Sequence, residues 1–210
     1  ALLPSAASAP AAPASPPPNV AVDTFLIDGK VALLLPAGKV ELTDLHLEGA
    51  LPSLTAPIQA TLKTGIASGT ALWDLSARIQ ASLDGRAVDV DADLSGKGLP
   101  LVPAGVGPSS FKLITSLKED ALRVELKDGA FRNLSSGAFS IAACALSMKV
   151  EGPLAGPHAV EAAGNLEKIR FPAPRGPAEL SGLKLETKLI ASKQGIQVER
   201  CELSCPGLSS

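Results

Sequence analysis

The sequence predicts an all-β fold in which long antiparallel strands form a curled sheet. Apolar and polar residues alternate over long stretches, hairpin signals join two pairs of such stretches, and three stretches change phase in the middle. A strand of fourteen residues spans about 46 Å, and long strands twist. A sheet of about eleven such strands cannot stay flat, so it must curl, close on itself or pack on another sheet.

The N-terminal segment differs in composition from the rest of the chain. Residues 1–18 (ALLPSAASAPAAPASPPP) are mainly Ala, Pro and Ser, which predicts a Pro/Ala-rich linker with extended, polyproline II character. A first stretch of sheet is expected over residues 19–99. It begins with strands at 20–27, 30–35, 39–48 and 58–66. Turn signals separate the first three at Asp28-Gly29 and at Pro36 to Gly38, and Ser68-Gly69 follows the fourth.

The segment from Thr70 to Gly96 predicts a β-hairpin with a defined register. Every odd position from 71 to 83 is apolar, and Asp84-Gly85 favours a two-residue type I′ turn. Such a turn pairs Ile79 with Val90 and brings the apolar residues of both strands onto one face. Because turn chemistry and face pattern are independent and agree, the register is well specified.

A second hairpin is expected in residues 111–129. A turn at Glu119-Asp120 pairs Leu117 with Leu122, and the apolar sets of the two strands again coincide. Residues 100–110 form a loop or linker, and a second stretch of sheet over residues 111–210 is expected to continue the first. Its later strands are expected at 138–151, 158–171, 178–192 and 195–205.

Three of the expected strands reverse their apolar phase along their length. The reversals run from Val40 and Leu42 to Leu45 and Leu47, from Phe139 and Ile141 to Leu146 and Met148, and from Ile196 and Val198 to Cys201 and Leu203. A β-bulge produces such a reversal and bends the sheet, and a strand buried on both faces is the alternative. Repeated bulges favour a sheet that is folded along its length.

Three segments resemble the AsmA-like family of Gram-negative envelope proteins, which includes the TamB and YhdP types. They are GKVELTDLHLEG (38–49), SLDGRAVDVDADLSG (82–96) and LKLETKLIASKQGIQVERCELSCPGLSS (183–210), and the resemblance extends over roughly residues 20–210. It implies a taco-like sheet with an apolar groove. It also implies a periplasmic location, an inner-membrane anchor outside this chain, and a role in outer-membrane biogenesis and homeostasis through phospholipid movement.

A protein with such a role must shield the whole acyl chain from water, because exposing a sixteen-carbon chain to water costs about 12 kcal/mol. The leading hypothesis is a non-enzymatic protein whose groove binds or conducts phospholipid or another acyl-chain ligand. The alternative is a structural subunit that docks into a larger envelope or secretion complex. The candidate groove-lining residues, for which a closed core is the alternative, are Trp73, Leu75, Ile79, Val88, Val90, Leu94, Leu113, Leu117, Leu122, Val124 and Leu126.

Other functions find little support in the sequence. The 19 basic and 21 acidic residues are interspersed, which argues against nucleic acid as a partner. No apolar run approaches the length of a membrane-spanning helix. Asp89, Asp91 and Asp93 resemble the start of a calcium loop, but the glycine that such a loop needs is missing. His46 and His158 are isolated, and we expect no metal, no cofactor and no catalytic residues.

The three cysteines allow two interpretations. Cys201 and Cys205 would lie about 13 Å apart in an extended strand, too far for a disulfide. A disulfide between Cys144 and either of them is geometrically open. The favoured interpretation is that all three are small buried hydrophobic residues.

Overall fold

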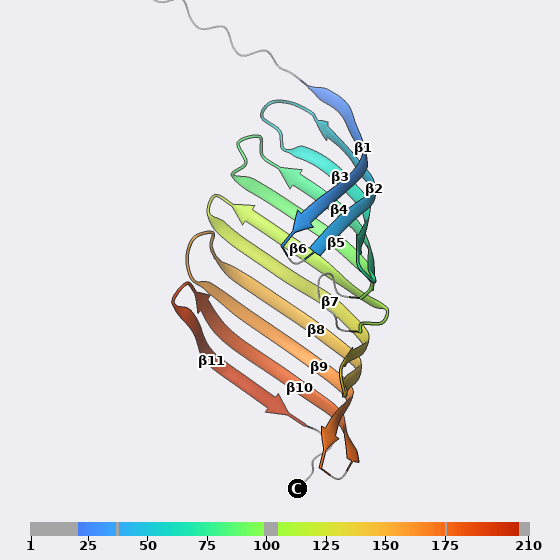
Figure 1. The fold of residues 1–210 in the computed structure, drawn as a ribbon. Coiled ribbons are helices and arrows are strands. Elements are labelled where there is room, and N and C mark those ends of the chain that lie inside the picture. Colours follow the sequence, from blue (N-terminus) through green and yellow to red (C-terminus); the bar gives the residue numbers. More distant parts are fainter. Residues whose placement is uncertain (1–20, 37, 99–104, 175, 206–210) are drawn as a thin grey trace, which may run out of the picture.

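The computed structural model describes residues 21–36, 38–98, 105–174 and 176–205. Every helix or strand assigned within them is a β-strand, and eleven strands form one antiparallel sheet in chain order (Figure 1). The predicted all-β, antiparallel class is therefore confirmed. The predicted Pro/Ala linker over residues 1–18 lies outside the described residues, as does most of the predicted loop at 100–110.

The strands are long, up to the 17 residues of β10. Their bounds are β1 Val22–Leu35, β2 Gly38–Leu51, β3 Ile58–Ser68, β4 Ala71–Ala81, β5 Ala87–Lys97, β6 Ser109–Lys118, β7 Ala121–Ser136, β8 Phe139–Pro153, β9 His158–Ala173, β10 Gly176–Ser192 and β11 Gly195–Ser204. Strands β5 and β6 pair with each other, so the sheet continues across the segment 99–104 that separates them.

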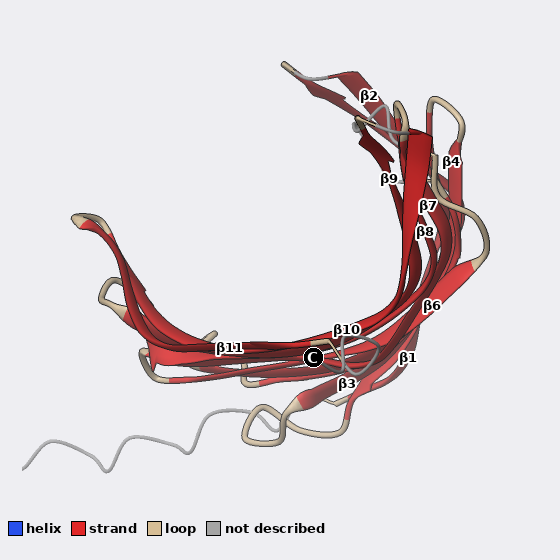
Figure 2. Cartoon of the chain, turned by 90° about the horizontal axis from the view of Figure 1, so that it is seen from below, coloured by secondary structure: helices blue, strands red, loops and turns tan. Residues whose placement is uncertain are grey.

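The sheet is a single layer that bends without closing. Each strand contacts only the strands beside it in the sequence, so no second layer packs on either face within the described residues. Seen along the stacking direction of the strands, the sheet has a C-shaped cross-section (Figure 2). The strands themselves bend to form the C. Residues that pair across neighbouring strands therefore follow one another along the length of the molecule.

The hairpin of β4 and β5 has the register that the sequence predicts. Ala81 pairs with Val88 and Ile79 pairs with Val90. On the opposite face, polar residues pair with polar residues over the same length of strand. Alternation over one long hairpin was enough to fix the pairing because a slip of one residue would reverse both faces.

The turn of this hairpin differs from the predicted type I′ turn. Gly85 has a φ of 70°, whereas Asp84 does not have a positive φ. The carbonyl of Ser82 accepts a hydrogen bond from the Gly85 N–H at 3.0 Å, and the Ser82 N–H donates to Ala87 at 2.8 Å. The Asp84 carboxylate accepts from the Ser82 hydroxyl at 2.6 Å and from the Arg86 N–H at 3.1 Å. Side-chain hydrogen bonds thus close a wider loop.

The second predicted hairpin, β6 and β7, is also confirmed in register. Leu117 pairs with Leu122 and Leu113 pairs with Leu126. Glu119 provides the turn with a φ of 57°, an uncommon conformation for a residue with a side chain.

The first strand corrects the prediction for the N-terminal part of the sheet. The sequence predicts two strands separated by a turn at Asp28-Gly29, whereas β1 is continuous. Asp28 pairs with His46 on β2, and the register shifts between Gly29 and Val31. The extra residue of this shift is on β2, where Asp44 has a positive φ, so Gly29 lies inside a continuous strand opposite a bulge of its neighbour.

The phase reversal in β2 is a β-bulge, as predicted. Pairing with β3 shifts around Asp44, whose φ is 52°. Leu42 and Leu47, on the two sides of the bulge, pair with Ile66 and Leu62, which lie on one face of β3. The bulge therefore keeps the apolar residues of β2 on a single face of the sheet.

The reversal in β11 has the same cause. The pairs Leu189–Val198 and Lys188–Arg200 leave Glu199 as the extra residue of β11. The apolar residues before and after Glu199 therefore return to the face that they share with β10.

The reversal in β8 arises differently, because β8 pairs with β9 without a register shift. The neighbouring strands carry left-handed residues at the same level, Asn133 with a φ of 52° on β7 and Lys168 with a φ of 51° on β9. Beyond that level Ile141 pairs with Leu134 and with Ile169. The predicted bulge of one strand is thus a distortion that several neighbouring strands share.

The buried core is small for a chain of this length. Its apolar members among the described residues are Ala71, Trp73, Ala77, Ala92, Val106, Ile141 and Ile169, and no large side chain there is completely buried. Trp73 lies 5.5 Å from Phe111 between ring centres, and its indole N–H donates to the Gly98 carbonyl at 2.8 Å. Gly96 pairs with Trp73 and has no side chain to obstruct the indole.

Candidate functional site

One face of the sheet carries two rows of paired residues that cross all eleven strands. We call the face with Ile79 and Ala77 the apolar face, and the other the polar face. The first row is Phe25, Gly49, Ala60, Ile79, Val90, Thr115, Val124, Val150, Val160, Leu189 and Val198. The second row is Ile27, Leu47, Leu62, Ala77, Ala92, Leu113, Leu126, Met148, Ala162, Thr187 and Cys201.

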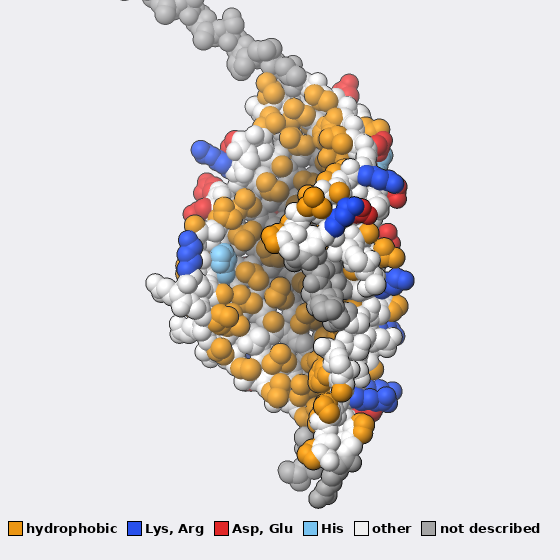
Figure 3. Space-filling view, viewed as in Figure 1, with side chains coloured by type: hydrophobic (Ala, Val, Ile, Leu, Met, Phe, Trp, Pro, Cys, Tyr) orange, Lys and Arg blue, Asp and Glu red, His pale blue; other side chains and the backbone are white. Residues whose placement is uncertain are grey.

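These rows form a continuous apolar surface along the molecule. At about 4.8 Å per strand, ten steps cover about 48 Å. Two threonines are the only hydroxyl side chains in the two rows, and neither row contains a charged residue. The space-filling view shows hydrophobic side chains gathered on the inner side of the curl, with Lys, Arg, Asp and Glu mostly at its edges (Figure 3).

The apolar face is open along most of its length. Small alanines at its centre are buried, with Ala77 5% and Ala92 3% exposed, because larger neighbours surround them. Most of the larger side chains in the two rows are only partly buried. Towards the two ends exposure rises to 51% at Ile27 and 59% at Val198.

The eleven residues that the sequence predicts as groove lining lie together on this face. They come from β4, β5, β6 and β7, and their pairing places all of them on the side of Ile79. Trp73 is 6% exposed, and the other ten are partly exposed. Whether they contact a lipid stays a prediction.

Sequence reasoning missed the two ends of the apolar face. Its candidates lie on β4 to β7, whereas the rows also cross β1 to β3 at one end and continue through Val150 and Val160 to Leu189 at the other. The alternation of β9 and β10 contains this signal, since both strands are apolar at every second position over most of their length. Alternation alone does not fix the register between these strands, so it does not show that the rows continue across them.

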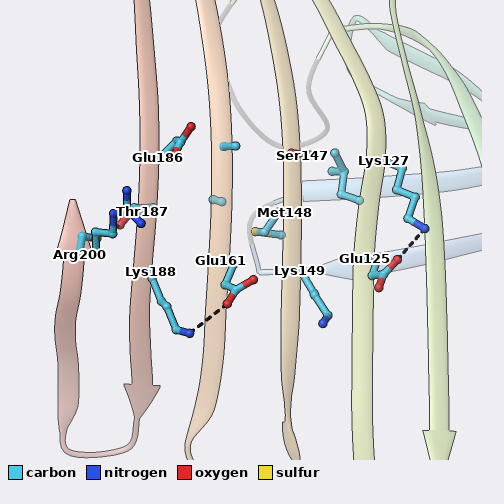
Figure 4. A pocket seen from close by; sticks show the side chains of 13 residues that line it. Glu125, Lys127, Ser147, Met148, Lys149, Glu161, Glu186, Thr187, Lys188 and Arg200 are labelled. Carbon is cyan, nitrogen blue, oxygen red and sulfur yellow. Dashed lines mark hydrogen bonds and ion pairs between the residues drawn. The ribbon is translucent and has the colours of Figure 1, made fainter. Parts of the chain in front are cut away.

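The polar face carries ion pairs between and along strands. A depression of about 650 Å³ on this side extends from β7 to β11, and Figure 4 shows its charged lining. Lys188 pairs with Glu161 at 3.1 Å and Lys127 pairs with Glu125 at 2.8 Å. Because the acids and bases of this depression largely neutralise one another, it does not favour a ligand of either charge.

Glu125 is the one buried charged residue among those described, with a side chain 8% exposed. Hydrogen bonds from Lys127 and from Arg123 lower the pKa of Glu125 to about 2. The same carboxylate raises the pKa of Arg123. These interactions order the polar face and do not prepare a catalytic acid, because a carboxyl group with such a low pKa stays ionised at neutral pH and has no proton to donate.

The three aspartates that resemble a calcium loop lie along one strand. Asp91 pairs with Lys112 on β6 at 3.0 Å, and Asp89 and Asp93 lie on the same face of β5. A strand spreads alternate carboxylates over about 13 Å and cannot wrap them around one ion. Within the described residues, no group of three or more histidine, cysteine or acidic side chains is placed to hold a metal ion.

The cysteines are free thiols in the structure. Strands β9 and β10 separate Cys144 from Cys201, so the disulfide that the sequence left open between them is not formed. Burial raises the pKa of the Cys144 thiol. Cys201 is exposed, which corrects its interpretation as a buried hydrophobic residue, while Cys205 is partly buried.

The two histidines lie on opposite faces. His46 is half exposed on the polar face, where its Nδ1 lies 2.7 Å from a carboxylate oxygen of Asp28. His158 begins β9, and it has the alternation phase of Val160 and Ala162, which belong to the two apolar rows.

Comparison with known proteins adds no identification. No family model, no curated protein and no solved structure matches this chain. In the part of the chain that the structure describes, no helix is long and apolar enough to cross a membrane.

Proposed function

We propose that the apolar face is a groove that binds acyl chains, and that the protein is a non-enzymatic, lipid-binding or lipid-conducting component of a Gram-negative envelope. The partners would be phospholipids or other acyl-chain ligands. The resemblance to the AsmA-like family adds the periplasm, an inner-membrane anchor outside this chain and outer-membrane homeostasis to this proposal.

The observation that carries the proposal is the pair of apolar rows that cross all eleven strands. An extended acyl chain has no polar group that needs a hydrogen bond, and each methylene left in water costs about 0.8 kcal/mol of free energy. A row without charged side chains over about 48 Å offers continuous contact to such a chain. The polar face, with its ion pairs, offers none.

The test is lipid binding by the full chain and by two matched variants. In Ile79→Asp a carboxylate enters the first apolar row, where a bound acyl chain would have to desolvate it. In Thr61→Asp the same charge enters β3 on the polar face, opposite Arg78. We expect native mass spectrometry to find phospholipid on the wild type and on Thr61→Asp, and none on Ile79→Asp.

Circular dichroism of the same samples separates a groove from a core. Ile79→Asp should keep its β-sheet signal, because its position is partly exposed to solvent. If it unfolds instead, the apolar face is a closed core in solution. If the wild type retains no lipid after incubation with phospholipid vesicles, the groove proposal fails.

A second candidate function is a structural subunit that docks into a larger envelope or secretion complex. The two edge strands favour it, because their apolar side chains are the most exposed of the sheet. Leu34 on β1 is 82% exposed and Ile196 on β11 is 70% exposed. Unpaired strand edges commonly bind another strand. In this case Ile196→Lys would abolish assembly, and lipid would be absent from the wild type.

A further inference from the structure

His158 interrupts an otherwise apolar row at the edge of the apolar face. Ile58, Ala81, Val88, Leu117, Leu122 and Gly152 follow one another in this row by direct pairing. His158 lies next to Gly152 and pairs on its other side with Ala191, which pairs with Ile196. In this row and in the two complete rows, His158 is the only side chain that can carry a positive charge.

The local structure makes room for the imidazole. A side chain added at Gly152 would contact Cδ2 of His158 at about 3.1 Å, so the absence of one lets the ring lie over the backbone of β8. The residue is partly buried overall. Its Nε2 atom, however, is enclosed and has no hydrogen-bond partner among the described residues. Buried polar atoms nearly always have a partner, so this atom requires an explanation.

A polar group of a ligand would be such a partner. Val160 and Ala162 follow His158 on the same face of β9, and each belongs to one of the apolar rows. A molecule that contacts all three has an apolar tail over the rows and a polar group at the edge of the sheet. A protonated imidazole donates strong, charge-assisted hydrogen bonds to carboxylate and phosphate oxygens.

We propose that His158 is the head-group site of the apolar groove and binds the anionic oxygen of a carboxylate or phosphate on an acyl-chain ligand. The site rests on the proposed function, since it needs the tail to lie in the groove. Because Nε2 is enclosed in the structure, binding through this atom requires the ring to turn about its Cβ–Cγ bond. The site therefore selects anionic amphiphiles over neutral ones of the same chain length.

The experiment compares three probes with the same ten-carbon chain: decanoate, decyl phosphate and decanol. Titration calorimetry on the full chain should show that both anions bind about tenfold more tightly than decanol. In His158→Leu this preference should disappear while decanol still binds. His158→Gln, which keeps a hydrogen-bond donor without the charge, should be intermediate. His46→Gln, the matched control on the polar face, should behave as wild type.

The outcomes separate this site from the groove itself. If no probe binds the wild type, the groove proposal fails. If decanol and the anions bind but His158→Leu keeps the full preference for anions, the groove stands and the head-group site is wrong. Binding of inorganic phosphate as tight as that of decyl phosphate would also overturn it, because the tail would then contribute nothing. A shift of the His158 ring signals in an NMR spectrum on adding decanoate, with His46 unchanged, supports it.

Discussion

Glu125 shows how single residues stabilise a sheet that has little core. Arg123 and Lys127 lie on either side of it along β7, and both donate to its carboxylate. Its pKa in the folded protein is about 2, below the ordinary value of 4.5. A carboxyl group with a lowered pKa contributes stability above its unfolded pKa, and this contribution is lost as the pH falls towards the folded pKa.

We therefore expect Glu125→Gln to reduce the loss of folding stability that the wild type shows at acid pH. In the wild type, the midpoint of urea denaturation should decrease as the pH is lowered from 4.5 to 2. Over this range the Glu125 carboxyl group takes up a proton in the unfolded state but stays ionised in the folded state. In Glu125→Gln the fall over this range should be smaller, and stability at pH 7 should be lower. The control is Glu167→Gln on β9, an exposed glutamate without an ion pair among the described residues. If wild type and Glu125→Gln showed the same dependence of stability on pH, the lowered pKa of Glu125 would be contradicted.

Residues of the candidate site could be predicted only where they lie in a hairpin whose alternation is clear in the sequence. Ile79 and Val90 were identified because one hairpin fixes both. In the sequence, His158 is only an isolated histidine. Its place among apolar side chains depends on pairing with β8 and β10, and its unpartnered nitrogen depends on three-dimensional packing. No spacing of residues along the chain contains that information.

At the scale of elements, the bulge in β2 is what joins two apolar phases into one face. Asp44 holds a φ of 52°, which costs roughly 1 kcal/mol or more in a residue other than glycine. Without the extra residue, Leu42 would turn to the polar face while Leu47 stayed on the apolar face. The whole first half of β2 would then expose its apolar side chains on the polar face.

Deletion of Asp44 should therefore lower stability much more than substitution at the same position. We expect Asp44→Gly to match or slightly exceed the wild type, because glycine adopts a positive φ without strain. The deletion should cost about 2 kcal/mol or more in the free energy of unfolding, measured by urea denaturation, because apolar side chains lose their burial. A deletion variant as stable as Asp44→Gly would show that β2 tolerates either phase and that the bulge does not determine the face.

Elements differ in how well their sequence specifies them. Hairpins with continuous alternation gave the right register even where the turn type was wrong, because the two faces constrain pairing more strongly than the turn does. Asp28-Gly29 was misread as a turn because a glycine in a strand and a glycine in a turn have the same local signature. The reversal in β8 is shared with its neighbours, so its register could not follow from one strand.

At the scale of the whole molecule, the sheet has an apolar face that nothing covers within the described residues. Folded domains normally bury such a face against a second layer. Here each strand contacts only its sequence neighbours. Contiguous apolar patches of more than a few hundred Å² are rare on soluble monomers and mark binding surfaces. The proposed function therefore predicts that this face contacts an apolar partner in water, either an amphiphile or a second copy of the chain.

We expect the purified, lipid-free chain to associate in aqueous buffer, and amphiphiles to reverse this. In sedimentation velocity runs, the average mass should rise with protein concentration, and dodecylphosphocholine should return it to that of the monomer. Ile79→Asp should associate less than the wild type, because its charge disrupts the first apolar row. Ile196→Lys, at the edge strand β11, distinguishes the surfaces. If it removes association and Ile79→Asp does not, the strand edges and not the apolar face bring the copies together. A chain that stays monomeric at every concentration, without bound amphiphile, would mean that the curl closes in solution and hides its apolar face.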